Sequence, residues 1–143
     1  MRFMVLVKAN SDSEAGVLPD KEAFAAMGRY NEELVKAGVL LAAEGLHPTS
    51  KGWRITFTGE RPTVTDGPFT ETKELVAGFW LIQVASKEEA LEWATRAPFG
   101  DGGEIEVRQV FEASDFPAEV VPPEGAAREQ ALREEPRRTA GQP

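Results

Sequence analysis

The sequence predicts an α+β fold of the ferredoxin-like kind, a split β-α-β arrangement with an extra hairpin strand. The order of the predicted elements is the first observation behind this: strand, helix, strand, hairpin, strand, helix, strand. The second is that two of the strand segments are apolar on both faces, as central strands of a sheet are. The third is composition, since 143 residues without cysteine must rely on one apolar core rather than on disulfides.

The first half of the chain contains a strand, a helix and a second strand. Residues 2–8 (RFMVLVK) are apolar at odd and even positions alike, which is typical of a central strand. Asp20 is a good N-cap and Gly38 a good stop, so a helix is predicted over 21–37. Residues 39–46 form the next predicted strand. The predicted inward face of the helix consists of Phe24, Met27, Leu34 and Val35.

A β-hairpin is predicted next. Apolar and polar residues alternate over 53–58, which indicates a half-buried strand. The turn Gly59-Glu60-Arg61-Pro62 then leads into a short strand at 63–65.

The second half repeats the pattern of strand, helix and strand. Residues 78–85 (GFWLIQVA) are apolar on both faces and predict another central strand. Ser86 and Glu89 form a capping box that starts a helix ending near residue 97. Residues 105–110 alternate and carry a more polar face, which places this last strand near an edge.

Two helices can cover only one face of such a sheet, although both central strands are apolar on two faces. A second copy of the sheet is the simplest cover for the other face, so a homodimer is predicted. The globular domain is predicted over residues 1–116. Residues 117–143 form a Pro-rich, charged tail, with a solvated helix over 124–135 and a disordered end.

Charge and composition exclude several classes of function. A net charge of −8 argues against direct binding to nucleic acid or to a membrane surface. No apolar run is long enough to span a bilayer, and a cysteine-free chain fits a cytoplasmic location. One histidine and no cysteine argue against a transition-metal site, and no P-loop or dinucleotide fingerprint occurs. We therefore predict neither a metal nor a cofactor.

Residues 63–75 (TVTDGPFTETKEL) concentrate charge, proline and glycine between two strand patterns. Gly67 permits backbone angles that other residues avoid, and Pro68 fixes its own φ, so the chain must turn a rigid corner here. Two interpretations are open. Asp66 either caps its own turn while Phe69 fills the core, or the corner holds the Asp66 carboxylate at the mouth of a pocket.

These residues, together with the flanking stretches EGLHPTSKGWRITF (44–57) and EIEVRQVFEASDF (104–116), closely resemble the YciI-related proteins of the DGPF type. The resemblance spans residues 1–116, and the motif DGPFTETKE carries it. It implies a dimeric α+β barrel and a cleft with a histidine and an aspartate as active-site residues. Relatives of this type are often encoded near, or fused to, extracytoplasmic-function sigma factors.

The candidate catalytic pair is therefore His47 and Asp66. His47 is the only histidine of the chain, and an imidazole beside a carboxylate is a sensible acid/base unit near neutral pH. The candidate substrate-binding residues are Glu44, Trp53, Arg54, Phe69, Glu71 and Lys73.

Two functions of different classes remain open. The first is a small cofactor-free enzyme in which His47 and Asp66 move protons on a small aromatic or carbonyl substrate. The second is a non-catalytic ligand-binding or regulatory module that works with a sigma factor, as the resemblance implies.

Overall fold

The computed structural model describes residues 1–70 and 74–140 of the chain. By their internal contacts the residues fall into two units, Met1–Val110 (unit 1) and Phe111–Pro143 (unit 2). The boundary predicted at residue 116 stays a prediction. The elements of unit 1 are β1 (Arg2–Lys8), α1 (Ser11–Glu14), α2 (Lys21–Lys36), β2 (Leu40–Gly45), η1 (Thr49–Lys51), β3 (Trp53–Thr58), β4 (Arg61–Asp66), β5 (Val76–Gln83), α3 (Lys87–Thr95) and β6 (Ile105–Gln109).

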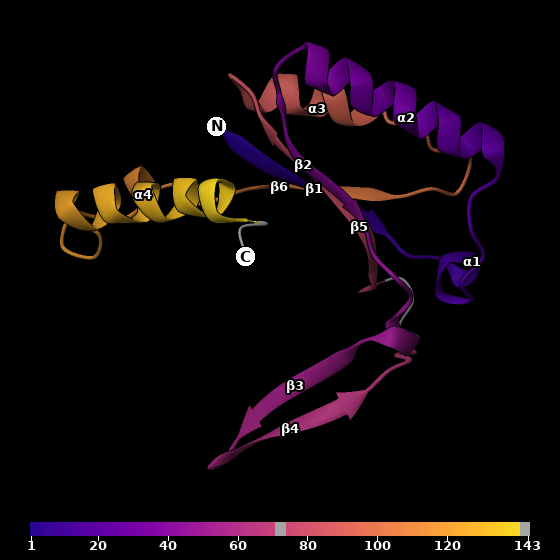
Figure 1. Ribbon diagram of the computed structural model, residues 1–143, viewed down its shortest axis with the longest axis horizontal. Helices are drawn as coiled ribbons and strands as arrows, with labels where there is room; N and C mark the ends of the chain where they lie inside the picture. Colours follow the sequence, from indigo (N-terminus) through magenta and orange to yellow (C-terminus); the bar gives the residue numbers. More distant parts are fainter. Residues whose placement is uncertain (71–73, 141–143) are drawn as a thin grey trace. The chain divides into compact units, whose positions relative to one another are not determined.

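Unit 1 is built on a four-stranded antiparallel sheet with the order β2-β5-β1-β6 (Figure 1). The two strands that are apolar on both faces, β1 and β5, lie in the centre, and β6 lies at an edge, as predicted. This order and these directions are those of a split β-α-β arrangement, and the α+β class is confirmed. The dimeric barrel stays a prediction.

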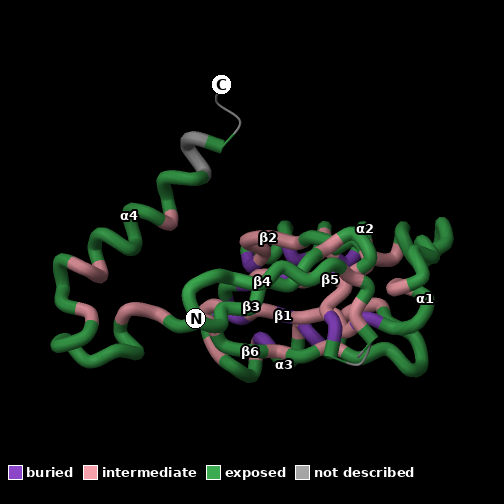
Figure 2. Tube along the Cα trace, turned by 90° about the horizontal axis from the view of Figure 1, so that it is seen from below, coloured by how far each residue is buried: buried purple, intermediate pink, exposed green. Residues whose placement is uncertain are grey.

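The core lies between one face of the sheet and the two long helices of unit 1. Phe3 and Val5 of β1 and Trp80 and Ile82 of β5 meet Leu34 of α2 there. Figure 2 shows the buried segments gathered in this part of the chain. Since side chains alternate along a strand, the intervening residues point to the other face of the sheet. These residues are Met4 and Leu6 of β1 and Phe79 and Leu81 of β5.

The inward face of α2 differs from the predicted one. Phe24 and Val35 are 73% and 63% exposed, whereas Tyr30 and Leu34 are buried. Successive helical residues point about 100° apart, so Val35 cannot share the direction of Leu34. The buried stripe instead has the spacing of residues 27, 30 and 34.

The predicted hairpin is a separate two-stranded sheet of β3 and β4, which we call the arm (residues 53–66). It extends away from the four-stranded sheet (Figure 1), and in the described chain its strands contact mainly each other. β4 begins at Arg61, earlier than the predicted 63–65. The prediction that β3 is half-buried is wrong, because all of its residues are exposed. Alternation identified an apolar face, but the residues that the structure describes leave that face exposed.

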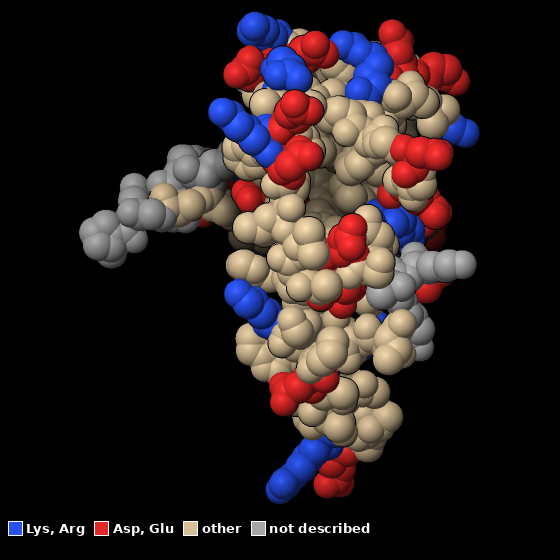
Figure 3. Space-filling view, turned by 90° about the vertical axis from the view of Figure 1, so that its right-hand side faces the viewer, with Lys and Arg blue, Asp and Glu red and all other residues tan. Residues whose placement is uncertain are grey.

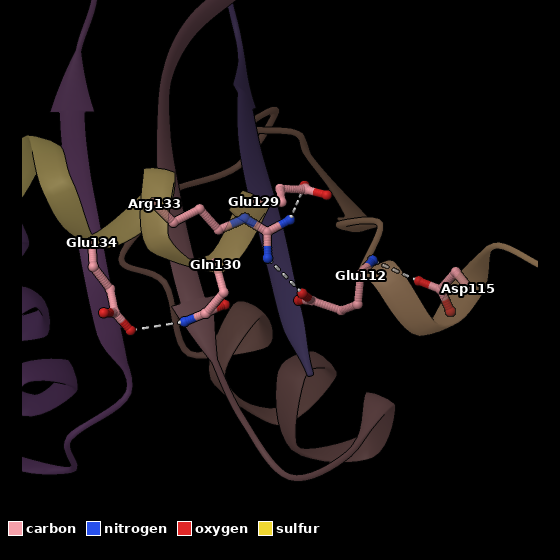
Figure 4. Close-up of polar contacts among 6 residues, drawn as sticks. All are labelled: Glu112, Asp115, Glu129, Gln130, Arg133 and Glu134. Atoms are coloured by element: carbon pink, nitrogen blue, oxygen red, sulfur yellow. Dashed lines mark hydrogen bonds and ion pairs between the residues drawn. The ribbon is translucent and has the colours of Figure 1, made fainter. Parts of the chain in front are cut away.

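Unit 2 contains a short turn of helix, η3 (Ala113–Asp115), and the helix α4 (Pro123–Thr139). The guanidinium of Arg133 donates to the carboxylates of Glu112 at 3.0 Å and Glu129 at 2.6 Å (Figure 4). The rings of Phe111 and Phe116 also contact each other, with centroids 5.1 Å apart. Along the described ranges, none of the helices has the length and apolar character needed to cross a bilayer.

Candidate functional site

The corner at Asp66-Gly67-Pro68-Phe69 is fixed against the segment that follows β2. The Gly67 N–H donates to the Gly52 carbonyl at 3.0 Å, and the peptide bond before Pro68 is cis. A Cβ at Gly67 would lie 1.7 Å from the carbonyl oxygen of Thr49. Glycine is therefore required for this close approach, which holds the last residue of β4 in a defined place.

Thr49 joins the corner to the N-terminal part of the chain. Its hydroxyl accepts the Phe69 N–H at 3.0 Å and donates to the Glu14 carboxylate at 2.5 Å. The Thr49 N–H donates to the other oxygen of the same carboxylate at 3.1 Å. Three segments far apart in the sequence thus meet at one threonine, and charge-assisted hydrogen bonds of this kind are the stronger ones.

Glu14 and Thr49 are site residues that the sequence reasoning missed. Glu14 ends the four-residue helix α1, in a stretch that reads as a polar loop. The capping box of Asn10 and Ser13 predicts a helical turn in this stretch. It does not predict that Glu14 accepts hydrogen bonds from Thr49, 35 residues away.

Four of the predicted site residues lie at the base of the arm, as two separate pairs. Trp53 and Asp66 are cross-strand partners in the register of β3 and β4, so their side chains share one face. The Arg54 guanidinium lies 3.9 Å from the centre of the Phe69 ring, a cation–π contact. Phe69 is half-buried at the corner and does not belong to the main core. The base of the arm therefore presents Asp66 and Trp53 on one face, and Arg54 beside the Phe69 ring apart from them.

His47 lies in the connection between β2 and η1, and its side chain is exposed. The Leu46 N–H donates to the Ala77 carbonyl at 2.8 Å, which extends the pairing of β2 with β5 up to the histidine. In the described part of the chain no hydrogen bond or ion pair joins His47 to Asp66. The catalytic pair thus stays a prediction.

Of the remaining candidates, one lies on β2 and two lie outside the described residues. Glu44 is exposed on β2, opposite Phe79 of β5. Glu71 and Lys73 lie outside the described residues. Among the residues that the structure describes, no group of three His, Cys, Asp or Glu side chains is placed to hold a metal ion.

Lys8 is a further charged residue at this end of the sheet that the sequence analysis did not single out. It ends β1 opposite Val76, and its ammonium lies 3.5 Å from the Glu106 carboxylate. The Lys8 side chain is only 14% exposed. Because Glu106 pairs with Leu6, this ion pair lies on the face of the sheet opposite the helices.

A hollow of about 360 Å³ lies elsewhere in unit 1, between α3 and β6. It is lined by apolar side chains such as Leu91, Phe99 and Val107, and none of its lining residues is ionisable. Acid/base chemistry cannot be assigned to this hollow, so the base of the arm remains the better candidate site.

These features define the class of the protein: an α+β protein with an antiparallel sheet, a projecting hairpin and a fixed acidic corner. The chain belongs to the YCII-related family, because the model of the YCII-related domain matches residues 1–114. An uncharacterized protein of Rhizobium meliloti (strain 1021) is 36% identical over 75 residues, which are 52% of this chain and 60% of that protein.

Among solved structures, the chain is similar to 5-chloro-2-hydroxyhydroquinone dehydrochlorinase from Burkholderia phenoliruptrix AC1100 in complex with 2,5-dihydroxybenzoquinone. The sequence identity is 16% and the TM-score 0.42, over 82% of this chain and 100% of that one.

Proposed function

We propose that the chain binds a small molecule at the base of the arm and that His47 and Asp66 exchange protons with it. The observation that carries this proposal is the fixed corner. The Gly67–Gly52 and Phe69–Thr49 hydrogen bonds hold the backbone directly after Asp66. A carboxylate held on such a framework keeps its geometry, which acid/base chemistry needs.

The neighbouring groups support a small and partly aromatic ligand. Trp53 stands beside Asp66 on the same face of the arm and offers a flat apolar surface. Arg54 lies on the opposite face of the arm, over the Phe69 ring, and is not part of the surface that Trp53 and Asp66 form. A ligand, rather than a direct hydrogen bond, would connect His47 with Asp66. Such a ligand would give a proton to one residue and receive one from the other.

The proposal is tested with a panel of phenols and enolisable carbonyl compounds, scored for turnover and for shifts of the single imidazole in NMR spectra. His47→Gln and Asp66→Asn are each expected to lower turnover by roughly 10²–10⁴-fold, because each removes one proton-transfer group. Asp101→Asn is the matched control, since Asp101 lies in an exposed turn of unit 1 and should leave turnover unchanged.

Unchanged turnover in His47→Gln and Asp66→Asn would refute the acid/base role. Ligand binding without turnover in the wild type would favour the second candidate, a non-catalytic module. The sigma-factor association that the resemblance implies stays a prediction for that module. It is tested by measuring binding to such a factor with and without the ligand.

A further inference from the structure

Lys8 lies where the chain that leaves the corner enters the four-stranded sheet. It is the last residue of β1 and pairs with Val76, the first residue of β5. The Ala9 N–H donates to the Leu75 carbonyl at 2.9 Å, so the two segments stay together for one residue more. The register of β1 and β5 shifts between Val7 and Lys8. Irregularities of this kind redirect a side chain and are common beside functional sites, which makes Lys8 a candidate for ligand binding.

His47 flanks the same end of β5 from the other side. The Leu46 N–H donates to the Ala77 carbonyl at 2.8 Å, and Ala77 directly follows the partner of Lys8. Neighbouring strands lie about 4.8 Å apart, so the backbones of Lys8 and His47 are separated by roughly 10 Å across β5. One small molecule can span that distance and reach both residues.

The positive charge of Lys8 is only partly balanced by its neighbours. The Lys8 ammonium lies 3.5 Å from the Glu106 carboxylate, which is longer than the roughly 2.8 Å of a strong charge-assisted hydrogen bond. The Arg108 guanidinium lies 4.0 Å from the other oxygen of the same carboxylate. Two cations therefore share one anion on this face of the sheet. Glu44, the acidic residue of β2 opposite Phe79, is exposed to water on the far side of β5, where its charge is screened.

Lys8 is also more buried than the other members of this charge cluster. Its side chain is 14% exposed, whereas those of Glu106 and Arg108 are 45% and 72% exposed. An ammonium has three donors, and one that has lost water is stabilised by each acceptor that approaches it. Among the described residues, Glu106 is the one ion-pair partner of Lys8. The ammonium therefore keeps donors for an anionic ligand.

The surface beside Lys8 is apolar and partly aromatic. Leu6 lies two positions before Lys8 on the same face of β1, and its cross-strand partner is the half-buried Phe79. The arm contributes little charge of its own, since uncharged side chains make up most of the side of it that Figure 3 shows. An ammonium at the end of an apolar strip with an aromatic ring is complementary to a ring that carries an anionic group.

We propose that Lys8 binds the anionic group of the ligand and that this ligand is an aromatic carboxylate. The role of Lys8 rests on the function proposed above and adds the chemical class of the molecule bound. Lys8 keeps its proton and holds the carboxylate by charge, whereas His47 and Asp66 exchange protons elsewhere on the same molecule. The Asp66 carboxylate is exposed and stays hydrated, so it needs no ion-pair partner in the free protein.

Binding is tested by titrating benzoate and benzamide into the protein while the amide signals of β1 and β5 are followed by NMR. The two probes share a ring and a shape, and only benzoate is charged. The wild type should bind benzoate at least roughly tenfold more tightly than benzamide, because one hydrogen bond to a charged group contributes about that factor. Lys8→Met should abolish this preference, and Lys8→Arg should retain most of it. Lys36→Met is the matched control, because it removes the same charge from the exposed end of α2 and should leave the preference unchanged.

Glu106→Gln distinguishes a ligand site from an ordinary ion pair. The substitution removes the carboxylate that competes for Lys8 and keeps a similar shape. Benzoate affinity should therefore rise, by roughly three- to tenfold, because the ligand no longer meets a negative charge beside the ammonium. If Lys8 and Glu106 serve only to stabilise the sheet, benzoate affinity will not change in Glu106→Gln, and that result would overturn the role of Lys8.

Three further results would overturn it: no benzoate binding to the wild type at millimolar concentrations, equal affinities for benzoate and benzamide, or equal losses in Lys8→Met and Lys36→Met. If Lys8→Met does not fold, the comparison of the two probes with the wild type and with Glu106→Gln decides. These titrations need no turnover. Lys8-dependent binding without turnover of any compound would count against the proposed proton exchange alone, and turnover that survives Lys8→Met unchanged would count against Lys8 alone.

Discussion

Gly67 brings two backbone segments closer together than any other residue type would permit. The atom that a Cβ would meet, at 1.7 Å, is a carbonyl oxygen of Thr49, which cannot move aside as a side chain can. Gly67→Ala must therefore push the corner away from η1 and break the hydrogen bond to Gly52. We expect the free energy of unfolding to fall by about 1–3 kcal/mol, measured by urea denaturation.

Gly45→Ala is the control for this substitution. A Cβ at Gly45 would have no atom within 4 Å, and the residue is exposed, so the free energy of unfolding should change by less than about 0.5 kcal/mol. An equally small loss in Gly67→Ala would show that the corner adjusts easily. It would then not be a fixed support for Asp66.

Tyr30 gives a second prediction at the scale of the residue. Burial raises the pKa of its hydroxyl, while nearby Arg96 lowers it and Glu33 raises it. The neutral phenol donates to the Trp93 carbonyl at 2.7 Å. The stability that the neutral Tyr30 hydroxyl contributes is fully present at pH values below its pKa of about 10 in the unfolded chain. It is lost as the pH rises through the higher pKa of this hydroxyl in the folded protein.

We therefore expect the native protein to form phenolate only above about pH 10 and to lose stability over the same range. Tyr30 is the only tyrosine, so ultraviolet absorbance reports this one group. Tyr30→Phe should remove both the absorbance change and this part of the alkaline loss. Phenolate formation in the folded protein at or below pH 10 would contradict the expectation.

Among the elements, those with local signals were predicted best. The Asp20 side chain accepts the Ala23 N–H at 2.8 Å and starts α2 where the sequence placed it. Ser86 likewise caps α3 by accepting the Glu89 N–H at 3.1 Å. The Glu89 carboxylate, however, accepts from Ala85 rather than from Ser86, so the predicted capping box is displaced by one residue. Caps depend on neighbours within a few residues, which is why sequence alone suffices for them.

The arm and the corner have features that the sequence alone did not predict. Alternation in β3 correctly identified an apolar face but could not tell whether the chain itself covers that face. The turn residues of the corner were recognisable, because glycine and proline have strong local preferences. The link from Phe69 through Thr49 to Glu14 depends on contacts between distant segments. Nothing local in those residues specifies these contacts.

At the scale of the whole molecule, the two units differ in how they are stabilised. Unit 1 has a shared apolar core that includes Val5, Leu34 and Ile82, all almost completely buried. Unit 2 depends on the ring contact of Phe111 with Phe116 and on the ion pairs of Arg133. Exposed or partly exposed ion pairs typically contribute less than about 1 kcal/mol each, and a lone helix of this length is marginal in water. Unit 1 should therefore carry most of the stability of the chain.

Deleting residues 119–143 is expected to shift the melting temperature by less than about 4 °C, which corresponds to under about 1 kcal/mol for a domain of this size. Circular dichroism should show the lost helix while the main transition persists. Arg133→Gln is a milder variant that removes the ion pairs to Glu112 and Glu129 and keeps the chain length. Arg133→Gln should speed amide hydrogen exchange in α4, and it should leave the amides of β1 and β5 protected from exchange. If the deletion lowers the melting temperature by 10 °C or more, on the order of 2 kcal/mol, then α4 stabilises the first 110 residues or their dimer directly.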